Sequence, residues 1–282
     1  MDRNAQKKVL AVSSEVGIGA VGLSILRFVL AAQKVSLLSL PTVFLPSRPD
    51  MGTVLRHIFP AQLLEQQIEA LNHDGLLDTL DGVLTGYFAE AEQVTVMAKT
   101  IRALKTQNPD LYVLVDPVLG DFDTGLYVPS DVAARVRDEL VPLADIITPN
   151  LFEFLWLTGE ESLQDAHGPD VLQSLFQLRY KVAVPRLVIT SAQIRPPKLL
   201  TCLIADDVVT GFESHYFPAV PKGTGDVFAA TLLGHLLQHG SSHEKLEEGV
   251  RATVKALERV ADKAQGLSQI EPYLLFNPNK NS

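Results

Sequence analysis

A short segment in the carboxyl-terminal third of the chain has the residue types that phosphoryl transfer needs. Gly223-Thr224-Gly225 opens the apolar helix predicted over Val227–Gln238, and no Gly-Lys-Ser/Thr marks a Walker loop anywhere in the chain. Small residues at a helix start leave backbone N–H groups without carbonyl partners, and these point at an anion together with the positive end of the helix dipole. The charge of the next residue, Asp226, would repel a bound phosphate. We therefore interpret Asp226 as the base that accepts the proton of a substrate hydroxyl. The alternative is an acid that only complements the helix dipole.

Two more acids follow a predicted buried strand, in the segment Asp116-Pro117-Val118-Leu119-Gly120-Asp121. In open α/β sheets, ligands bind beyond the carboxyl ends of the strands. Asp116 and Asp121 are therefore candidates to hold cations that screen phosphate charge. An ordinary Asp-Pro turn followed by a polar loop explains the same residues, and both interpretations stay open.

The pattern Asn150-x-x-Glu153 precedes another apolar helix and is close to a capping box. A capping box accounts for both side chains structurally. The same Glu153 carboxylate would reach a hydrated Mg²⁺ if the helix start faces the cleft, and the local sequence does not separate the two roles.

A second glycine-rich segment, Gly17-Ile18-Gly19-Ala20-Val21-Gly22, matches the G-x-G-x-x-G pattern of dinucleotide sites. Such sites also need an acid about 20 residues later for the ribose. Here the second strand ends at Leu40, and Pro41-Thr42-Val43-Phe44 follows without an acid. We favour a tight turn that borders a substrate pocket, and keep a dinucleotide-dependent oxidoreductase as an alternative.

Composition and charge exclude several other classes. The 282 residues include 24 Lys plus Arg and 33 Asp plus Glu, a net charge of −9. Without a basic run, we do not expect nucleic acid as a partner. The most apolar long stretch, Gly19–Ala32, is interrupted by Arg27 and is too short to span a bilayer, so we expect no membrane partner either. The single Cys202 rules out an intramolecular disulfide and fits a reducing compartment, predicted to be the cytoplasm. A turn at Gly240 interrupts the spacing of His235, His239 and His243, so no zinc site is predicted.

Short β-branched runs alternate with helix-period segments and must position these motifs. The alternation predicts an α/β fold, with a parallel sheet and helices on both faces. The predicted strands are Val9–Ser13, Val35–Leu40, Gly82–Thr85, Leu111–Asp116, Asp145–Thr148 and Arg186–Thr190, with a hairpin of Leu199–Ile204 and Val208–Phe212. The predicted helices are Gly19–Ala32, Pro60–Leu71, Glu90–Gln107, Ser130–Leu140, Asn150–Leu157, Asp170–Tyr180, Thr224–Gln238 and Ser242–Lys263.

Three further expectations concern boundaries. The Pro-rich stretch Pro41–Met51 is predicted to be too irregular for a core element. Ser241-x-x-Glu244 is predicted to be the capping box of the last helix. No linker or repeat interrupts the chain, so a single domain over residues 1–282 is the simpler organisation.

Taken together and in this order, the segments resemble the ribokinase superfamily, and most closely its pyridoxal kinase branch. The resemblance runs from Val9 to about Leu237. Its most specific parts are Gly86-Tyr87 with Ala91-Glu92-Gln93, Asp116–Asp121 with Leu126-Tyr127-Val128-Pro129, Ala144–Asn150 with Glu153, and Gly223-Thr-Gly-Asp226.

The resemblance implies a single-domain, three-layer sandwich with a central, mostly parallel sheet and a small β hairpin or flap. It also implies a homodimer, and ATP-dependent phosphorylation of the 5′-hydroxymethyl group of pyridoxal, pyridoxine or pyridoxamine. The cofactors it implies are ATP as co-substrate and Mg²⁺, together with K⁺ or Na⁺.

By position, the resemblance also assigns roles to individual residues. Asp226 would be the general base, with the Gly223–Gly225 amides, including that of Thr224, as the anion hole. Asp121 and Glu153 would assist Mg²⁺ and the phosphates, and Asp116, Thr148 and Thr190 match positions near a monovalent cation. The nucleotide-contacting positions are Asn150 and Ser191, with Phe217-Pro218-Ala219 at the edge of the adenine site. Ser14, Thr42 and Tyr87 match positions around the pyridine ring.

Departures from the family pattern gather at the substrate end. Pyridoxal kinases commonly carry Ser-His-Val after the first strand and Gly-His-x-Gly shortly afterward. This chain has Ser14-Glu15-Val16 and Gly19-Ala20-Val21-Gly22, and Pro46-Ser47-Arg48-Pro49 replaces the usual aromatic-rich lid. A related hydroxymethyl heterocycle such as hydroxymethylpyrimidine stays open as the substrate. A non-catalytic sensor on a kinase scaffold is a further alternative, against which the retained Asp226 argues.

Overall fold

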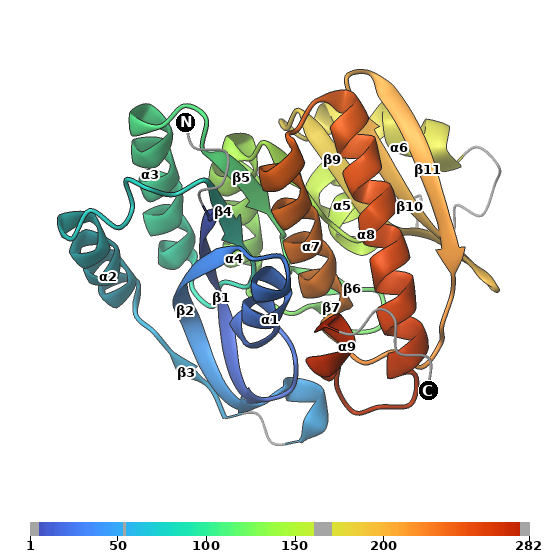
Figure 1. The fold of residues 1–282 in the computed structure, drawn as a ribbon, viewed down its shortest axis with the longest axis horizontal. Helices are drawn as coiled ribbons and strands as arrows, with labels where there is room; N and C mark the ends of the chain where they lie inside the picture. Colours follow the sequence, from blue (N-terminus) through green and yellow to red (C-terminus); the bar gives the residue numbers. More distant parts are fainter. Residues whose placement is uncertain (1–5, 53–54, 161–170, 277–282) are drawn as a thin grey trace.

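The computed structural model describes residues 6–52, 55–160 and 171–276, and they form one mixed, mostly parallel sheet covered by helices on both faces (Figure 1). Within these residues the main sheet has nine strands, in the order β11-β10-β9-β8-β5-β4-β1-β2-β3. The six central strands, β9, β8, β5, β4, β1 and β2, pair in parallel. Strands β10 and β11 at one edge of the sheet, and β3 at the other, are antiparallel additions. This order confirms the predicted α/β class and places the carboxyl ends of the parallel strands along one edge.

The main-sheet strands are β1 (Lys8–Ile18), β2 (Ser36–Ser47), β3 (His57–Ile58), β4 (Gly82–Thr85), β5 (Tyr112–Val115), β8 (Ile146–Ile147), β9 (Arg186–Arg195), β10 (Lys198–Ala205) and β11 (Val208–His215). A separate small hairpin joins β6 (Gly120–Asp121) to β7 (Gly125–Leu126). The longer helices are α1 (Leu23–Ala32), α2 (Ala61–His73), α3 (Ala91–Gln107), α4 (Ser130–Arg135), α5 (Leu151–Thr158), α6 (Val171–Leu178), α7 (Thr224–His239) and α8 (His243–Ala264), with short α9 (Tyr273–Phe276) at the end.

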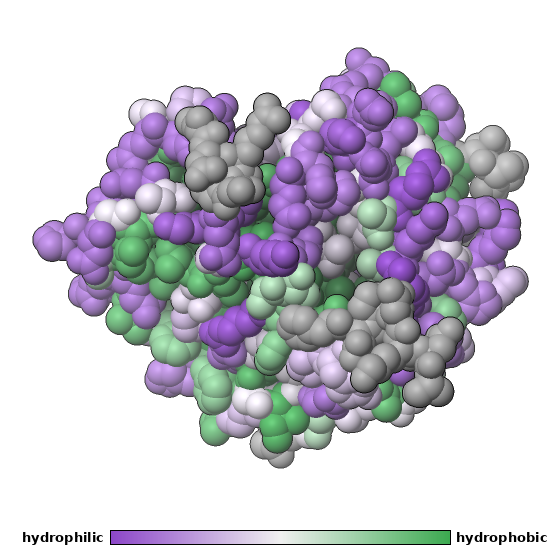
Figure 2. All heavy atoms as spheres, in the orientation of Figure 1, coloured by the Kyte–Doolittle hydropathy of each residue, from purple (hydrophilic) through white to green (hydrophobic). Residues whose placement is uncertain are grey.

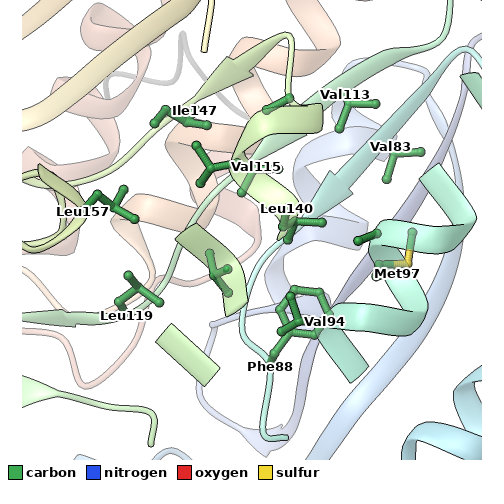
Figure 3. Close-up of a cluster of buried hydrophobic side chains, with 14 of the residues drawn as sticks. Val83, Phe88, Val94, Met97, Val113, Val115, Leu119, Leu140, Ile147 and Leu157 are labelled. Carbon is green, nitrogen blue, oxygen red and sulfur yellow. The ribbon is translucent and has the colours of Figure 1, made fainter. Parts of the chain in front are cut away.

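Alternate residues of each strand face opposite helix layers. In β1, Leu10 and Val12 pack with α2 to α6, whereas Val9 and Ala11 pack with α1, α7 and α8. The first of these two cores is shown in Figure 3, where Val94 of α3 lies beside Phe88, and Met97 of the same helix lies on the side of Val83 of the sheet. The second core lies under α8, whose outer surface is largely hydrophilic in Figure 2. The two cores fix the sheet between its helices, as the three-layer prediction requires.

Most predicted elements are confirmed, and the clearest differences are in one strand and one helix cap. The expectation for Pro41–Met51 is wrong up to Ser47, because β2 continues through Pro41 and Pro46 and pairs with β1 as far as Ile18. The strand tolerates both prolines near the sheet edge, where a missing N–H costs little. A register shift in β1 between Ser13 and Glu15 accompanies the extension.

The second difference is the cap of α8, which is Ser242 and not Ser241; its side chain accepts from the Lys245 N–H. The predicted helix start at Asp170 lies outside the described residues and is not tested. The predicted hairpin is confirmed, since Asp206 and Asp207, both with positive φ, form the turn between β10 and β11. Cys202 lies buried in β10, and this burial raises the pKa of its thiol to about 12, so it acts as a core residue. Within the described part of the chain, no helix is both long and apolar enough to cross a membrane.

Candidate active site

Polar residues gather where the parallel strands end. Ser13 and Ser14 lie in β1, Gly86-Tyr87 follows β4, and Asp116 follows β5. Thr148 follows β8, and Thr190 and Ser191 lie in the neighbouring strand β9. Since the carboxyl ends of these strands share one edge of the sheet, the topology brings the predicted site residues to one face.

The two glycine-rich segments of the sequence meet at this edge. Gly223, the N-cap of α7, has φ +107°, and a Cβ there would collide with the carbonyl oxygen of Ala20. Gly22, the N-cap of α1, lies against Ser14 in the same way, and its backbone N–H donates to the carboxylate of Asp226. The glycines of Gly17–Gly22 therefore allow close packing of a turn beside the site, as predicted.

Asp226 sits in the first turn of α7, directly after Gly223–Gly225 in the chain, and is partly buried. Burial raises the pKa of its carboxyl to about 6, and the hydrogen bond from Gly22 acts in the opposite direction. An acid with a pKa near neutrality is ionised at physiological pH and still accepts a proton readily. These are the properties that a general base requires.

Asp116 is buried, and the hydroxyl of Thr148 donates to its Oδ1 at 3.1 Å. Its pKa lies well above the usual range because of burial, followed by the negative charges of Glu153 and Asp226. Asp116 thus lies within electrostatic reach of two other carboxylates. The loop after Asp116 is also strained, since Val118, a β-branched residue, has φ +47°.

Glu153 and Asn150 form a complete capping box at the start of α5, which confirms the structural interpretation of this pair. Glu153 Oε2 accepts from the Asn150 N–H at 2.8 Å, and Oε1 accepts from the N–H groups of Leu119 (2.8 Å) and Gly120 (3.4 Å). The Asn150 amide donates in turn to the Gly120 carbonyl at 2.8 Å. Burial raises the pKa of Glu153 to about 7, against the effect of these donors. The box therefore fixes the strained loop to α5, and both Glu153 oxygens are occupied.

Asp121, in β6, is an ion-paired carboxylate. Its Oδ2 lies 2.6 Å from Lys222 Nζ and also accepts from the Tyr127 hydroxyl, while Oδ1 accepts from the Thr124 N–H at 2.7 Å. The pKa of Asp121 is lowered to about 2 because the bonds from Lys222 and Tyr127 outweigh its burial. Lys222 precedes Gly223, so this pair ties the small β6–β7 hairpin to the start of α7.

The described residues contain no group of three or more His, Cys, Asp or Glu side chains that could hold a metal ion by themselves. Mg²⁺ in phosphoryl transfer needs only one or two protein carboxylates beside substrate phosphates. Asp116 fits that demand, because its negative neighbours disfavour its ionised form and a cation would relieve this repulsion.

A cavity between β9, β10, the start of α7 and α8 contains most of the residues predicted to bind nucleotide. It is lined by Thr190, Ser191, Phe217, Thr224 and Gly225. Pro218 and Ala219 are outside the described lining, and the Ala219 carbonyl instead accepts from the Gly266 N–H at 3.0 Å. Asn150 and Glu153 are outside it as well, in the capping box at the start of α5.

One side of this cavity is an apolar wall formed by α8 and its neighbours, which the sequence did not predict. The wall consists of Phe228, Val254, Leu257 and Ala261. The apolar face of the long helix α8 could have signalled it, since that face continues past the residues that pack on α7.

The predicted substrate residues lie at the other end of the same edge. The Thr42 hydroxyl donates to the Tyr87 carbonyl at 2.7 Å, and the Tyr87 N–H donates to the Ser13 hydroxyl at 3.1 Å. Tyr87 packs with a small apolar cluster of Val16, Val43, Leu45 and Ala89. Its pKa is raised by burial, which Arg56 partly offsets. Thr42 and Tyr87 are thus held together, and Ser14 lies beside Gly22 and so close to Asp226.

Glu15, which stands where the family commonly has histidine, does not join that group. Its carboxylate pairs with Arg27 at 2.6 Å and accepts from the Ser24 hydroxyl at 2.7 Å, both in α1. The residue therefore anchors β1 to α1.

The segment after α8 contacts the Gly17–Gly22 turn and Pro46–Pro49, the stretch that stands where the family commonly has its lid. Gln269 Oε1 accepts from the Gly19 N–H at 3.1 Å, and the Ser268 carbonyl accepts from Arg48 at 2.9 Å. Arg48 is itself buried and pairs with Asp50 at 2.5 Å. Residues near the end of the chain thus hold both the Gly17–Gly22 turn and the Pro46–Pro49 stretch.

An open, mostly parallel sheet with a glycine-rich helix start and a partly buried acid at the carboxyl ends of its strands is typical of the small-molecule kinases of the ribokinase-like superfamily. Comparison with known proteins narrows this class. The sequence model of the phosphomethylpyrimidine kinase family matches residues 47–271. The chain belongs to this family, within its pyridoxal kinase branch.

The relatives agree with this assignment. The pyridoxine/pyridoxal/pyridoxamine kinase of Bordetella avium is 35% identical over 268 residues, which cover 91% of this chain and 87% of that protein. The pyridoxal kinase of Leishmania donovani, solved in complex with ADP, superposes with a TM-score of 0.83 at 25% identity and covers 97% of both chains. The pyridoxal kinase of Entamoeba histolytica, at 23% identity, has the same fold, with a TM-score of 0.83 over 96% of both chains. The dinucleotide-dependent oxidoreductase is therefore abandoned as an alternative.

Proposed function

We propose that this protein transfers the γ-phosphoryl group of ATP to the 5′-hydroxymethyl group of pyridoxal, pyridoxine or pyridoxamine. The family assignment supports a kinase, and the names and nucleotide complexes of its relatives support vitamin B6 and ATP as substrates. One observation in this chain carries the proposal. Asp226, with a pKa raised to about 6, lies at the start of α7, next to the Gly223–Gly225 amides and within reach of the Gly22 N–H.

In this mechanism the adenine end of ATP occupies the cavity beside Phe217 and Ser191, and its terminal phosphates face the start of α7. The vitamer lies on the side of Thr42 and Tyr87, so its primary alcohol points at Asp226. Asp226 accepts the alcohol proton while the oxygen attacks the γ-phosphorus, the bond to the β-phosphate oxygen breaks, and ADP leaves. The Gly223–Gly225 amides and the α7 dipole stabilise the charge on the transferred group.

Mg²⁺ would accompany the triphosphate in this proposal and neutralise part of its charge. Asp116 would hold it directly or through water, with Thr148 orienting the carboxylate. Thr190 lies next to that position, since both its N–H and its hydroxyl donate to the Pro149 carbonyl. A K⁺ or Na⁺ near Asp116, Thr148 and Thr190 stays a prediction, as do the homodimer and the cytoplasmic location.

A coupled assay of ADP release tests the proposal across pyridoxal, pyridoxine, pyridoxamine and hydroxymethylpyrimidine. We expect turnover with at least one B6 vitamer and a 5′-phosphorylated product by mass spectrometry. Turnover with hydroxymethylpyrimidine alone would favour the other heterocycle, which the missing family histidines keep open. ATP binding without turnover of any of the four would identify a sensor instead.

A further inference from the structure

Lys222 brings a positive charge to the phosphate end of the site. It directly precedes the Gly223–Gly225 amides, and its Nζ lies 2.6 Å from Asp121 Oδ2. The Lys222 side chain is 51% exposed and that of Asp121 is 21% exposed. About half of the Lys222 side chain is therefore accessible from solvent, even though its ammonium group is paired with Asp121.

Lys222 lies among acidic residues. It pairs with Asp121, and elsewhere in the site the charges of Glu153 and Asp226 raise the pKa of Asp116. The charge of Lys222 also contributes to lowering the pKa of Asp50. A triphosphate adds further negative charge to this group. A mobile cation beside the amides would offset part of that repulsion.

We propose that Lys222 is a positioning residue for the terminal phosphates of the nucleotide, held by Asp121 until they arrive. This rests on the proposed kinase function and adds a residue to it. Lysine suits the task because its four-carbon stem is flexible and its ammonium has three donors. After the exchange Asp121 keeps its bonds from the Tyr127 hydroxyl and the Thr124 N–H, so it is not left unpaired.

A purely structural role would give Lys222 the same contacts. In that case the ion pair would only tie the β6–β7 hairpin to the start of α7. The two roles predict different effects of removing the charge of Asp121. A structural ion pair is lost when either partner is replaced, whereas a phosphate-binding lysine becomes free to bind phosphate when Asp121 loses its charge.

Isothermal titration calorimetry with AMP-PNP and with AMP distinguishes the phosphate-positioning role of Lys222 from the structural role, since AMP lacks the two terminal phosphates. In EDTA buffer, Lys222→Met should weaken AMP-PNP binding about tenfold and leave AMP binding within about twofold. Lys222→Arg should recover most of the AMP-PNP affinity, and Asp121→Asn should tighten AMP-PNP binding a few fold. Lys7→Met is the matched control, because Lys7 pairs with Asp81 at 2.7 Å at the opposite edge of the sheet. It should change neither affinity.

Equal weakening of AMP-PNP and AMP in Lys222→Met, or unchanged AMP-PNP binding, would overturn the proposal. So would an Asp121→Asn variant that weakens AMP-PNP as Lys222→Met does. Thermal unfolding of each variant accompanies the titrations, and if Lys222→Met does not fold, the direction of the Asp121→Asn effect decides. Wild-type protein that binds AMP-PNP but turns over no B6 vitamer would refute the proposed function alone.

Discussion

The backbone N–H of Gly22 donates a hydrogen bond to the carboxylate of Asp226. This bond joins the turn before α1 to the first turn of α7, two segments at opposite ends of the sequence. It places the proposed base between two helix N-termini, where backbone donors favour its ionised form and burial opposes it. The position of the acid is thus set by glycine packing on both sides.

Replacement of Asp226 by Asn should cut kcat by about 10²-fold or more, because the amide does not accept the alcohol proton. The nearly equal size of the two side chains should leave the affinity for AMP-PNP close to that of the wild type. Steady-state kinetics with a B6 vitamer, together with calorimetry, measure both quantities. Near-normal kcat would remove Asp226 from the base role.

The same variant should be more stable than the wild type at pH 8. The pKa of Asp226 is raised from 3.8 to about 6 in the folded protein, so the folded state favours the protonated acid, and its ionisation costs stability as the pH rises through 6. Since Asp226 is partly exposed, we expect a gain of about 1–2 kcal/mol for Asp226→Asn. Melting temperatures should differ by a few degrees at pH 8 and converge as the pH falls from 6 toward 4. An Asn variant that melts lower at pH 8 would contradict this.

The catalytic efficiency, kcat/KM, should fall at acidic pH. Ionised Asp226 is the active form of the base, and both its pKa of about 6 and that of Glu153, about 7, lie above those of ordinary acids. We expect kcat/KM to be level at pH 8 and to decline steadily below pH 7, as first Glu153 and then Asp226 take up a proton. A profile that stays level to pH 5 would show that neither proton matters.

Removal of the Glu153 side chain should damage both stability and nucleotide use. In Glu153→Ala the buried N–H groups of Leu119, Gly120 and Asn150 lose their acceptor, at a cost of about 2–4 kcal/mol. The loop that carries Asp116 should also loosen, which raises the KM for ATP. Ser242→Ala, which removes the exposed cap of α8, is the control and should cost about 1 kcal/mol without a change in KM. Denaturant unfolding compares the two; equal losses would mean that the box is only a cap.

Gly223 should tolerate no side chain. Gly223→Ala combines a positive φ with a collision against the Ala20 carbonyl, so the amides that face the phosphate must move. We expect a tenfold or larger loss in kcat/KM, in keeping with the geometric demands of phosphoryl transfer. Gly240→Ala, at the other end of α7, has φ +92° and no atom near the new Cβ. It should cost about 1–2 kcal/mol of stability and no activity. Similar kinetics for the two variants would refute this account of the loop.

The sequence predicted those features of the fold and the site that depend on residues close together in the chain. Strand β4 was predicted at its observed bounds because Gly82–Thr85 is a short apolar run between polar segments. The capping box of Asn150 and Glu153 was found for the same reason, since its partners are three residues apart. The strand through Pro41 and Pro46 was missed because local turn signals were overridden by pairing with β1.

Contacts between distant segments left no trace in the local pattern. The contacts of Glu153 with Leu119 and Gly120, and of Lys222 with Asp121, depend on the approach of separate loops. The family resemblance supplied positions for these residues without their partners. Thus Asp121, assigned to Mg²⁺ by the resemblance, holds a lysine in this structure. The acids at the strand ends were predictable from the sequence, whereas their hydrogen-bond and ion-pair partners were not.

The hydrogen bonds from Gly19 to Gln269 and from Arg48 to Ser268 matter for the design of experiments on this protein. We expect a change to Ser268 or Gln269 to loosen the substrate side of the site and to lower the measured activity. The amino terminus enters the sheet at Lys8, at the edge remote from the strand ends that carry the site (Figure 1). Tags and surface immobilisation belong there.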